Sequence, residues 1–300
     1  MTIDLNNVTA VENVKGDEPI LGHLMWFSVG KQLVKADDLQ AALTAAGIDQ
    51  AFMPNPIRSS DAFRRATKEI EVKKGTAQTN VFKNYLIREV FADKDMIQRN
   101  IVVETVDQSG KRLDYESNAG IITLDKKNNS LTFVTSDPIT EDLCKMAEEK
   151  FNIYKEYYSA QQVRVMVSKI LNSLAPTPVR PNGGVYFVPN AYTEGLTKLV
   201  NFTSSLENSE CFKVPIVNTY DNVQMVSQKL SDHFDTLLAE CKGSGNLRKS
   251  QVKDLINHAN GIIKDYKDYR SIVQSEASFF EEKILHLKRE VARLVDNMED

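Results

Sequence analysis

The sequence predicts an α+β fold, in which a mixed N-terminal domain with a short antiparallel sheet precedes a C-terminal helical hairpin with a coiled-coil arm. Two observations predict it. Between residues 81 and 134, apolar residues alternate with polar ones and turn-forming stretches interrupt them, as in an antiparallel meander. Over residues 252–298, apolar residues recur at alternating steps of three and four, as in a coiled-coil seam. We therefore expect a loose segment 1–18, a head domain 19–218 and a helical hairpin 219–300.

In the first part of the head we expect a strand over 21–29 and a helix over 36–46. The acidic residues Asp37 and Asp38 suit a helix start, and Gly47 suits its end. Ser59 or Ser60 can cap a second helix that runs to about Val72. Strands are expected over 81–90 and 98–106, followed by shorter ones over 112–115, 120–124 and 131–134.

The second part of the head begins with a helical pattern over 140–175, which Pro176 and Pro178 end. A short strand over 185–188 and a helix over 191–206 follow. Residues 212–217 form the last expected strand, and Pro215 makes it an edge strand or a short piece because proline cannot donate to a central ladder.

The charge balance limits the classes of partner. Lys+Arg total 37 and Asp+Glu total 41, so the net charge is only -4 and the surface as a whole cannot act as a polyanion binder. Any contact with nucleic acid must be local. No stretch approaches the roughly 18 apolar residues of a membrane span, and residues 1–16 lack a signal-peptide pattern, so we expect a cytoplasmic protein without membrane association.

Cysteine and histidine are too sparse and too scattered to predict a metal or cofactor site. The three cysteines are odd in number and form no CxxC pair, and the four histidines form no HExxH motif. Asp232, His233 and Asp235 could place metal-ligating groups on one helical turn. His233, however, falls on an apolar seam, so we interpret it as a polar device that fixes helix register.

A basic run in the second helix is the best local candidate for a binding surface. Between 58 and 74, Arg58, Arg64 and Lys68 are cations that could contact phosphates or an acidic partner. Arg65 lies four residues from both Asp61 and Glu69 and is expected to be neutralised by them. A solvated, ion-paired face explains the same pattern, and the sequence favours that interpretation.

Two short motifs resemble catalytic ones only superficially. Glu71-Val72-Lys73 matches the ExK piece of metal-dependent nucleases, but such pieces lie on strands and this one is expected at a helix end. Gly183-Gly184 precedes a strand, whereas a phosphate loop follows one. We therefore predict no catalytic residues and a protein that is not an enzyme.

The helical part carries the strongest signal. A turn over 242–246 separates a shorter arm, 221–241, from a longer one, 252–298, and every seam position of the longer arm except Arg270 is apolar. Residues beyond about 270 then have a seam but no neighbour in the hairpin, which predicts homo-oligomerisation or a foreign partner. Packing of this arm against 140–175 of the same chain is the alternative. The predicted oligomerisation seam consists of Val273, Phe280, Ile284, Leu287, Val291, Leu294 and Met298.

Three stretches, 21–28, 53–67 and 180–189, together resemble a family of uncharacterised proteins from bacteria, archaea and their phages, known only as a domain of unknown function. The resemblance covers residues 20–220 and supplies no catalytic residues. It implies a phage or mobile-element setting.

The function that these observations predict is a non-enzymatic, oligomerising interaction protein that binds a host or phage protein. In a phage setting, one form of it is an inhibitor of a host defence complex. The alternative is a nucleic-acid-binding or nucleic-acid-processing protein that uses the basic helix 58–74.

Overall fold

The structure, a computed structural model, describes residues 20–181 and 183–299. Its contacts divide the chain into two compact units. The first unit comprises Met1–Gln32, Ala41–Met53 and Val163–Asp300, and the second comprises Leu33–Gln40 and Pro54–Gln162. The predicted boundary at residue 218 falls inside the first unit.

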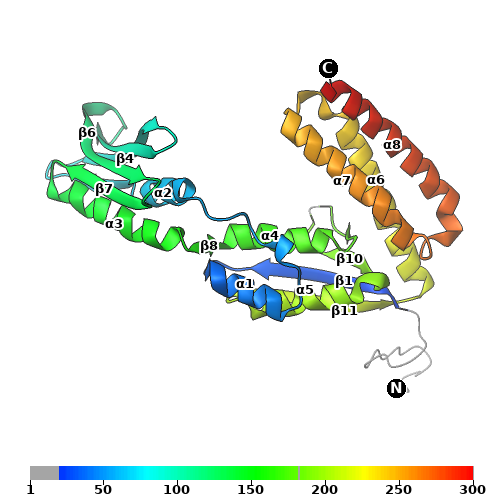
Figure 1. Cartoon of the computed structure of the whole chain (residues 1–300). Helices are drawn as coiled ribbons and strands as arrows, with labels where there is room; N and C mark the ends of the chain where they lie inside the picture. The colour runs from blue at the N-terminus through cyan, green and yellow to red at the C-terminus, as the bar shows by residue number, and fades with distance from the viewer. Residues whose placement is uncertain (1–19, 182, 300) are drawn as a thin grey trace, which may run out of the picture. The chain divides into compact units, whose positions relative to one another are not determined.

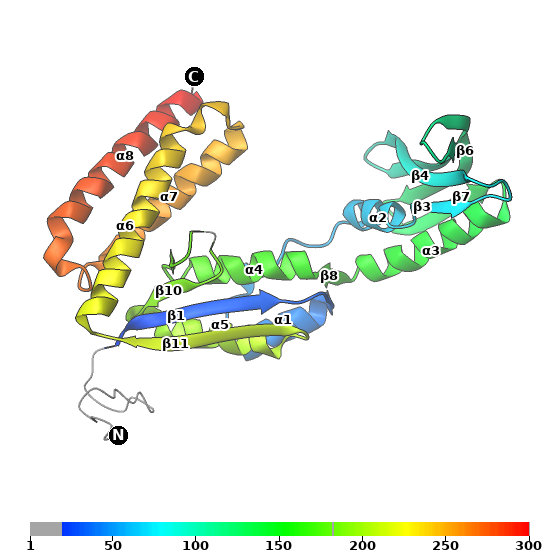
Figure 2. The ribbon, with the colours of Figure 1, turned by 180° about the vertical axis from the view of Figure 1, so that it is seen from behind.

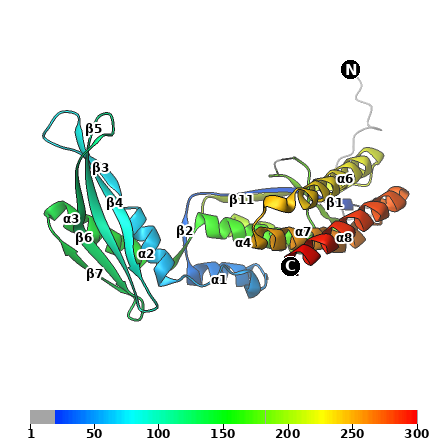
Figure 3. The same cartoon turned by 90° about the horizontal axis from the view of Figure 1, so that it is seen from above.

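The second unit contains a five-stranded antiparallel half-barrel whose strands follow chain order: β3 (Val72–Gly75), β4 (Val81–Ala92), β5 (Met96–Asp107), β6 (Arg112–Asp125) and β7 (Ser130–Thr135) (Figure 3). This confirms the predicted meander. Asp107 and Asp125 form its tight turns, because each carboxylate accepts backbone N–H groups of the residues that follow. The two short strands expected over 112–124 are one long strand, β6, whose pairing with β5 absorbs irregularities in register.

Helices α2 (Ser59–Lys68) and α3 (Pro138–Tyr154) bury their apolar faces against this sheet. The helix expected over 140–175 is interrupted, because residues after Lys155 form β8 (Tyr157–Ser159), which pairs with β2 (Leu33–Lys35), before α4 (Ala160–Asn172) begins. Helix α2 ends at Lys68 instead of Val72, and Val72 starts β3.

The first unit contains a four-stranded antiparallel sheet in the order β11 (Ser209–Val217), β1 (Ile20–Val29), β10 (Tyr186–Pro189), β9 (Thr177–Pro178) (Figure 2). Strand β11 is an edge strand, as Pro215 predicts. Helix α5 (Thr193–Ser205) packs on β11 and β1. Helix α1 (Ala36–Ala45), whose last five residues belong to this unit, is followed closely by Gly47, whose φ of 68° is the left-handed conformation expected after a helix end. Short 3₁₀ turns span Gln50–Phe52, Asn190–Tyr192, Ser244–Asn246 and Gln274–Glu276.

The C-terminal helices α6 (Tyr220–Lys242), α7 (Lys249–Tyr269) and α8 (Ala277–Glu299) pack together as a three-helix bundle (Figure 1). The prediction of one long second arm is wrong. The chain leaves the helix at Arg270, the single polar position of the seam, and a 3₁₀ turn follows before α8 folds back on α6 and α7. Serine and β-branched residues over 271–275 favour such a break.

Folding back buries the seam within the chain. Phe280 and Leu287 are fully buried, and Ile284 and Met298 are half-buried. The bundle core continues into the sheet through Leu21, Ala175 and Phe187. The expectation that this seam lacks a neighbour in the same chain is therefore wrong, because α6 and α7 supply one. The fully buried or nearly buried seam residues are Val273, Phe280, Leu287, Val291 and Leu294.

Within the described part of the chain, none of the helices has the combined length and apolar composition that a bilayer crossing requires.

Candidate functional site

The three predicted partner-binding residues of the basic helix all lie in ion pairs. Arg58 pairs with Asp61 at 2.8 Å, Arg64 with Glu89 at 2.9 Å, and Lys68 with Glu71. The ion-paired face that the sequence favours is thus present on α2.

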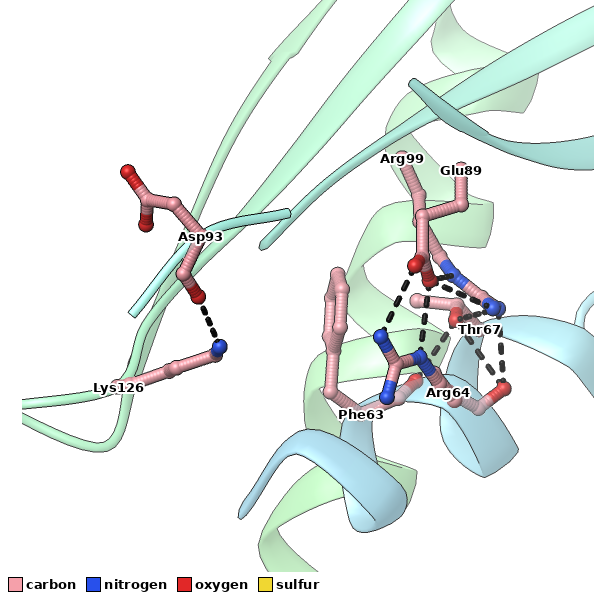
Figure 4. A network of polar contacts seen from close by, with 7 residues as sticks. All are labelled: Phe63, Arg64, Thr67, Glu89, Asp93, Arg99 and Lys126. Atoms are coloured by element: carbon pink, nitrogen blue, oxygen red, sulfur yellow. Dashed lines mark hydrogen bonds and ion pairs between the residues drawn. The ribbon is translucent and has the colours of Figure 1, made fainter. Parts of the chain in front are cut away.

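Glu89 on β4 is the centre of this network (Figure 4). Arg64 donates two hydrogen bonds to it at 2.9 Å each, and Arg99 donates a third at 3.1 Å. Arg99 also donates to the Thr67 hydroxyl at 2.9 Å, which ties β5 to α2. The hydrogen bonds from Arg64 lower the pKa of Glu89 from 4.5 to about 2. Arg64 therefore contributes to the fold of the second unit as a bidentate partner.

Arg65 is also paired, as predicted, with Glu69 at 3.3 Å, and its guanidinium stacks 3.7 Å over the Tyr154 ring. Glu69 accepts additional hydrogen bonds from Lys150 and Tyr154. Asp61, the other acid expected to neutralise Arg65, pairs with Arg58 instead. The charges of α2 are balanced by neighbours from α2, α3, β4 and the segment that follows the helix.

The ExK motif lies where β3 begins, and not at a helix end as expected. The Glu71 carboxylate accepts from Lys68 and from the backbone N–H of Ile87 at 3.0 Å, so both of its oxygens are engaged. Among residues 20–181 and 183–299, no three His, Cys, Asp or Glu side chains are grouped to hold a metal ion.

The three cysteines are poor nucleophiles. Cys144, Cys211 and Cys241 are all buried free thiols. Burial raises the thiol pKa of Cys144 to about 12 and that of Cys211 to about 11, and it also raises that of Cys241. Thiolate, the reactive form, is thereby disfavoured.

A cleft of about 750 Å³ in the first unit brings together polar groups from separate elements. One wall is α7, with His233 of α6 beside it. The opposite wall consists of the end of α4 and the strands β9 and β10 with the loop between them. Lining residues outside α7 include Lys169, Asn172, Thr177, Gly183, Tyr186 and His233.

Two tyrosines take part in hydrogen bonds that hold α7 in place beside the cleft. The fully buried Tyr269 hydroxyl donates to the Ala175 carbonyl at 2.6 Å and accepts from Thr177 at 2.9 Å. Tyr192 donates to Asp268 at 2.8 Å, and burial together with Asp268 raises the pKa of Tyr192 to about 12. The cleft is therefore bounded by a hydrogen-bonded scaffold.

The α7 wall is a polar stripe: Asp254, His258, Gly261 and Asp265 are spaced by four, three and four residues, which places them on one face of the helix. Sequence reasoning missed this stripe because it followed the apolar seam and assigned the remaining positions to solvent. Gly261 was the feature of the sequence that could have indicated the stripe. It lies inside α7, where glycine costs about 1 kcal/mol relative to alanine.

Close packing does not require glycine at this position, because a Cβ atom at position 261 would meet nothing within 4 Å. The position instead lines the cleft. A glycine at such a place lets another molecule approach the helix backbone closely.

Asp265 is the most unusual charge in the cleft. It is half-buried, and its carboxylate makes no hydrogen bond or ion pair with any described residue. Burial, followed by the nearby Asp268, raises its pKa. Asp254 and Asp265 face a single cleft cation, Lys169, so the lining has an excess of negative charge.

His233 and His258 lie side by side, with ring centroids 5.5 Å apart. Burial and the neighbouring His258 lower the pKa of His233 to about 4, and burial lowers that of His258. Both rings are therefore neutral at pH 7 and offer hydrogen bonds without charge. The acids near His233 are ion-paired: Asp232 pairs with Lys229, and Asp235 pairs with Lys283. The role of His233 in fixing helix register stays a prediction.

A second groove of about 490 Å³ adjoins the cleft, because both are lined by Asp254 and His258. It adds the carboxylate of Glu240 and the exposed apolar side chain of Leu247. Together the two hollows form an elongated surface with three carboxylates along it: Glu240, Asp254 and Asp265.

Comparison with known proteins identifies the family without a function. The chain belongs to a family of unknown function, DUF6744, whose model matches residues 20–300. The match includes the helical bundle as well as the region that carries the sequence resemblance. No curated protein and no solved structure matches the chain.

Proposed function

We propose that this member of the DUF6744 family is a non-enzymatic binding protein whose cleft receives a positively charged, extended segment of a partner protein. The observation that carries the proposal is Asp265, a half-buried carboxylate that lines the cleft and forms no ion pair or hydrogen bond with any described residue, although Lys264 and Lys267 partly offset its charge. Removing a carboxylate from water is unfavourable unless an opposite charge compensates for it. A lysine or arginine of the partner would supply that charge.

The shape of the site favours a chain segment over a single small molecule. The cleft and its adjoining groove place Asp265, Asp254 and Glu240 in succession along α6 and α7, and the apolar Leu247 and Leu255 line the adjoining groove. An extended peptide with cationic and apolar side chains matches this order. The neutral His258 and Asn257 can hydrogen-bond its backbone.

The candidate catalytic groups that the sequence offers are not activated among the described residues. The three thiols have raised pKa values, and the carboxylate of the ExK motif is engaged by Lys68 and Ile87. The phage setting and the inhibition of a host defence complex stay predictions, and the partner is defined here only by its charge.

Titration with two capped hexapeptides tests the proposal. One alternates arginine with alanine and the other alternates glutamate with alanine, and calorimetry measures binding to the wild type, Asp265→Asn and Glu207→Gln. The third protein is a matched control, because it loses the same charge at an exposed site outside the cleft. We expect only the arginine peptide to bind, with a loss of at least about tenfold in Asp265→Asn, the size of one charged hydrogen bond, and little change in Glu207→Gln.

Equal affinities of the arginine peptide for Asp265→Asn and Glu207→Gln would show that the peptide does not bind in the cleft. Only a general attraction to an acidic protein would then remain. The nucleic-acid alternative is tested in parallel with a DNA duplex and the triple variant Arg58→Glu/Arg64→Glu/Lys68→Glu. Suppose that the wild type binds DNA in a salt-sensitive manner and that the variant, folded by circular dichroism, does not. The nucleic-acid-binding function on α2 would then replace the proposed one.

A further inference from the structure

A further groove of the bundle, which shares no lining residue with the cleft, has an apolar floor and a basic rim. It lies between α7 and α8 and has a volume of about 460 Å³. Ile263 and Ile284 are half-buried in it, and Leu285 is 49% exposed. An apolar surface of this kind on a helical pair is a common docking site for another helix.

The charged residues that line this groove, Lys267, Arg270, Lys288 and Glu281, carry a net positive charge. Arg270 pairs with Glu281 at 3.4 Å, whereas Lys267 and Lys288 form no ion pair with any described residue. The hydroxyl of Tyr266, in the same groove, also lacks a hydrogen-bond partner in the described chain. The groove therefore suits a helix that offers apolar side chains flanked by carboxylates.

Helix α3 of the second unit presents such a face. Ile139, Met146 and Ile153 are 36%, 45% and 42% exposed. They recur every seventh residue and therefore lie in one stripe along the helix. Asp142 and Glu149 follow the same seven-residue repeat, are exposed and form no ion pair with described residues.

We propose that α3 of one copy of this chain docks into the α7–α8 groove of a second copy. The apolar stripe of α3 covers Ile263, Ile284 and Leu285, and its carboxylates reach Lys267 and Lys288. This interface goes beyond the proposed function, because it uses neither the cleft nor a foreign partner. Opposite charges on the two surfaces favour this pairing over α3 against α3, in which like charges would meet.

The two contacting surfaces differ, so the association is heterologous. Each copy then retains a free groove and a free α3 stripe, and assembly proceeds to rings or open chains instead of stopping at a symmetric dimer. The mass in solution should therefore rise with concentration beyond twice 33.8 kDa.

Light scattering on two charge-reversed variants tests the proposal. The acid-reversed variant is Asp142→Lys/Glu149→Lys, and the base-reversed variant is Lys267→Glu/Lys288→Glu. Each alone should remain at 33.8 kDa, because like charges face each other in every possible contact. An equimolar mixture should assemble again, because α3 of either variant then meets a groove of opposite charge on the other.

The control is Lys94→Glu/Lys127→Glu, which reverses two exposed lysines away from both surfaces and should assemble as the wild type does. Circular dichroism checks that every variant is folded. A wild type that stays at 33.8 kDa up to its solubility limit would overturn the proposal. Assembly of either reversed variant by itself at the wild-type level, or failure of two folded variants to assemble when mixed, would overturn it as well.

Discussion

Helices α2 and α7 both present a charged face, and they differ in what balances the charges. On α2, Arg58, Arg64 and Lys68 each have a carboxylate partner within the second unit. On α7, neither Asp254 nor Asp265 forms an ion pair with a described residue, and Gly261 lies between them although no neighbour crowds it. The ion pairs of α2 are consistent with a role in stability, and our proposal assigns the α7 face to the binding of another molecule.

The charged face of α7 keeps its place only if α8 packs against α7. The substitution with the largest expected effect on stability tests this packing. Leu287→Asp puts a carboxylate at a position with no exposed surface in the bundle core. We expect a loss of at least about 4 kcal/mol in the free energy of unfolding, since both a cavity and a buried charge result. Urea unfolding followed by circular dichroism measures it.

Ser278→Asp, at an exposed position of α8, is the control for that substitution and should change little. If Leu287→Asp left stability unchanged and only dissociated an oligomer, α8 would form an intermolecular seam and the α7 wall would lack its support.

Glu89→Gln tests whether the α2 charges serve the fold. It removes the negative charge and one of the two oxygens that accept from Arg64, and it leaves Arg99, whose side chain is only 14% exposed, without an ionic partner. Because Glu89 itself is 31% exposed, solvent screening reduces the expected cost to about 1–2 kcal/mol. Thermal unfolding of the wild type and the variant at pH 7 gives the difference.

The pH dependence of that difference provides a second check. Glu89 has a folded pKa of about 2 against an ordinary value of 4.5, so its stabilising effect is fully present above pH 4.5 and is lost as the pH falls towards 2. The wild type and Glu89→Gln should therefore converge in stability over that window. A difference that is independent of pH there would show that the ion pairs of α2 do not stabilise the second unit.

Gly261→Ala is expected to have a smaller effect and of the opposite sign. A Cβ atom at this position meets no neighbour, so the gain in helix propensity should raise stability by about 0.5–1 kcal/mol. The same methyl group should weaken binding of the arginine peptide, because it occupies the wall of the cleft. Calorimetric unfolding and peptide titration measure the two effects, and tighter binding by the variant would show that the glycine serves no ligand.

Residues whose environment is set locally could be predicted from the sequence. Three features follow from neighbours along the chain: the meander, the edge position of β11, which Pro215 indicates, and the helix end near Gly47. The helix break at Arg270 could not be predicted in this way, because the heptad pattern continues through it. Whether such a pattern forms one long helix or two antiparallel ones depends on tertiary packing against α6.

The candidate site was less accessible to sequence reasoning for a similar reason. Asp254, His258 and Asp265 look like ordinary solvent-facing residues of an amphipathic helix. Their significance arises from the opposite wall around Thr177 and Tyr186, which is distant in sequence. Conversely, the basic run on α2 seemed available for binding because Glu89 and Arg99, which complete its network, lie on strands that no helical spacing rule connects to it.

Nuclear magnetic resonance mapping of the arginine peptide on the isotope-labelled full chain can distinguish binding at α7 from binding at α2. We expect backbone and imidazole resonances over 254–265 and of His233 to shift on titration, while those of α2, Ser59–Lys68, stay in place. Shifts confined to α2, or none at either helix at saturating peptide, would contradict the proposed binding at α7.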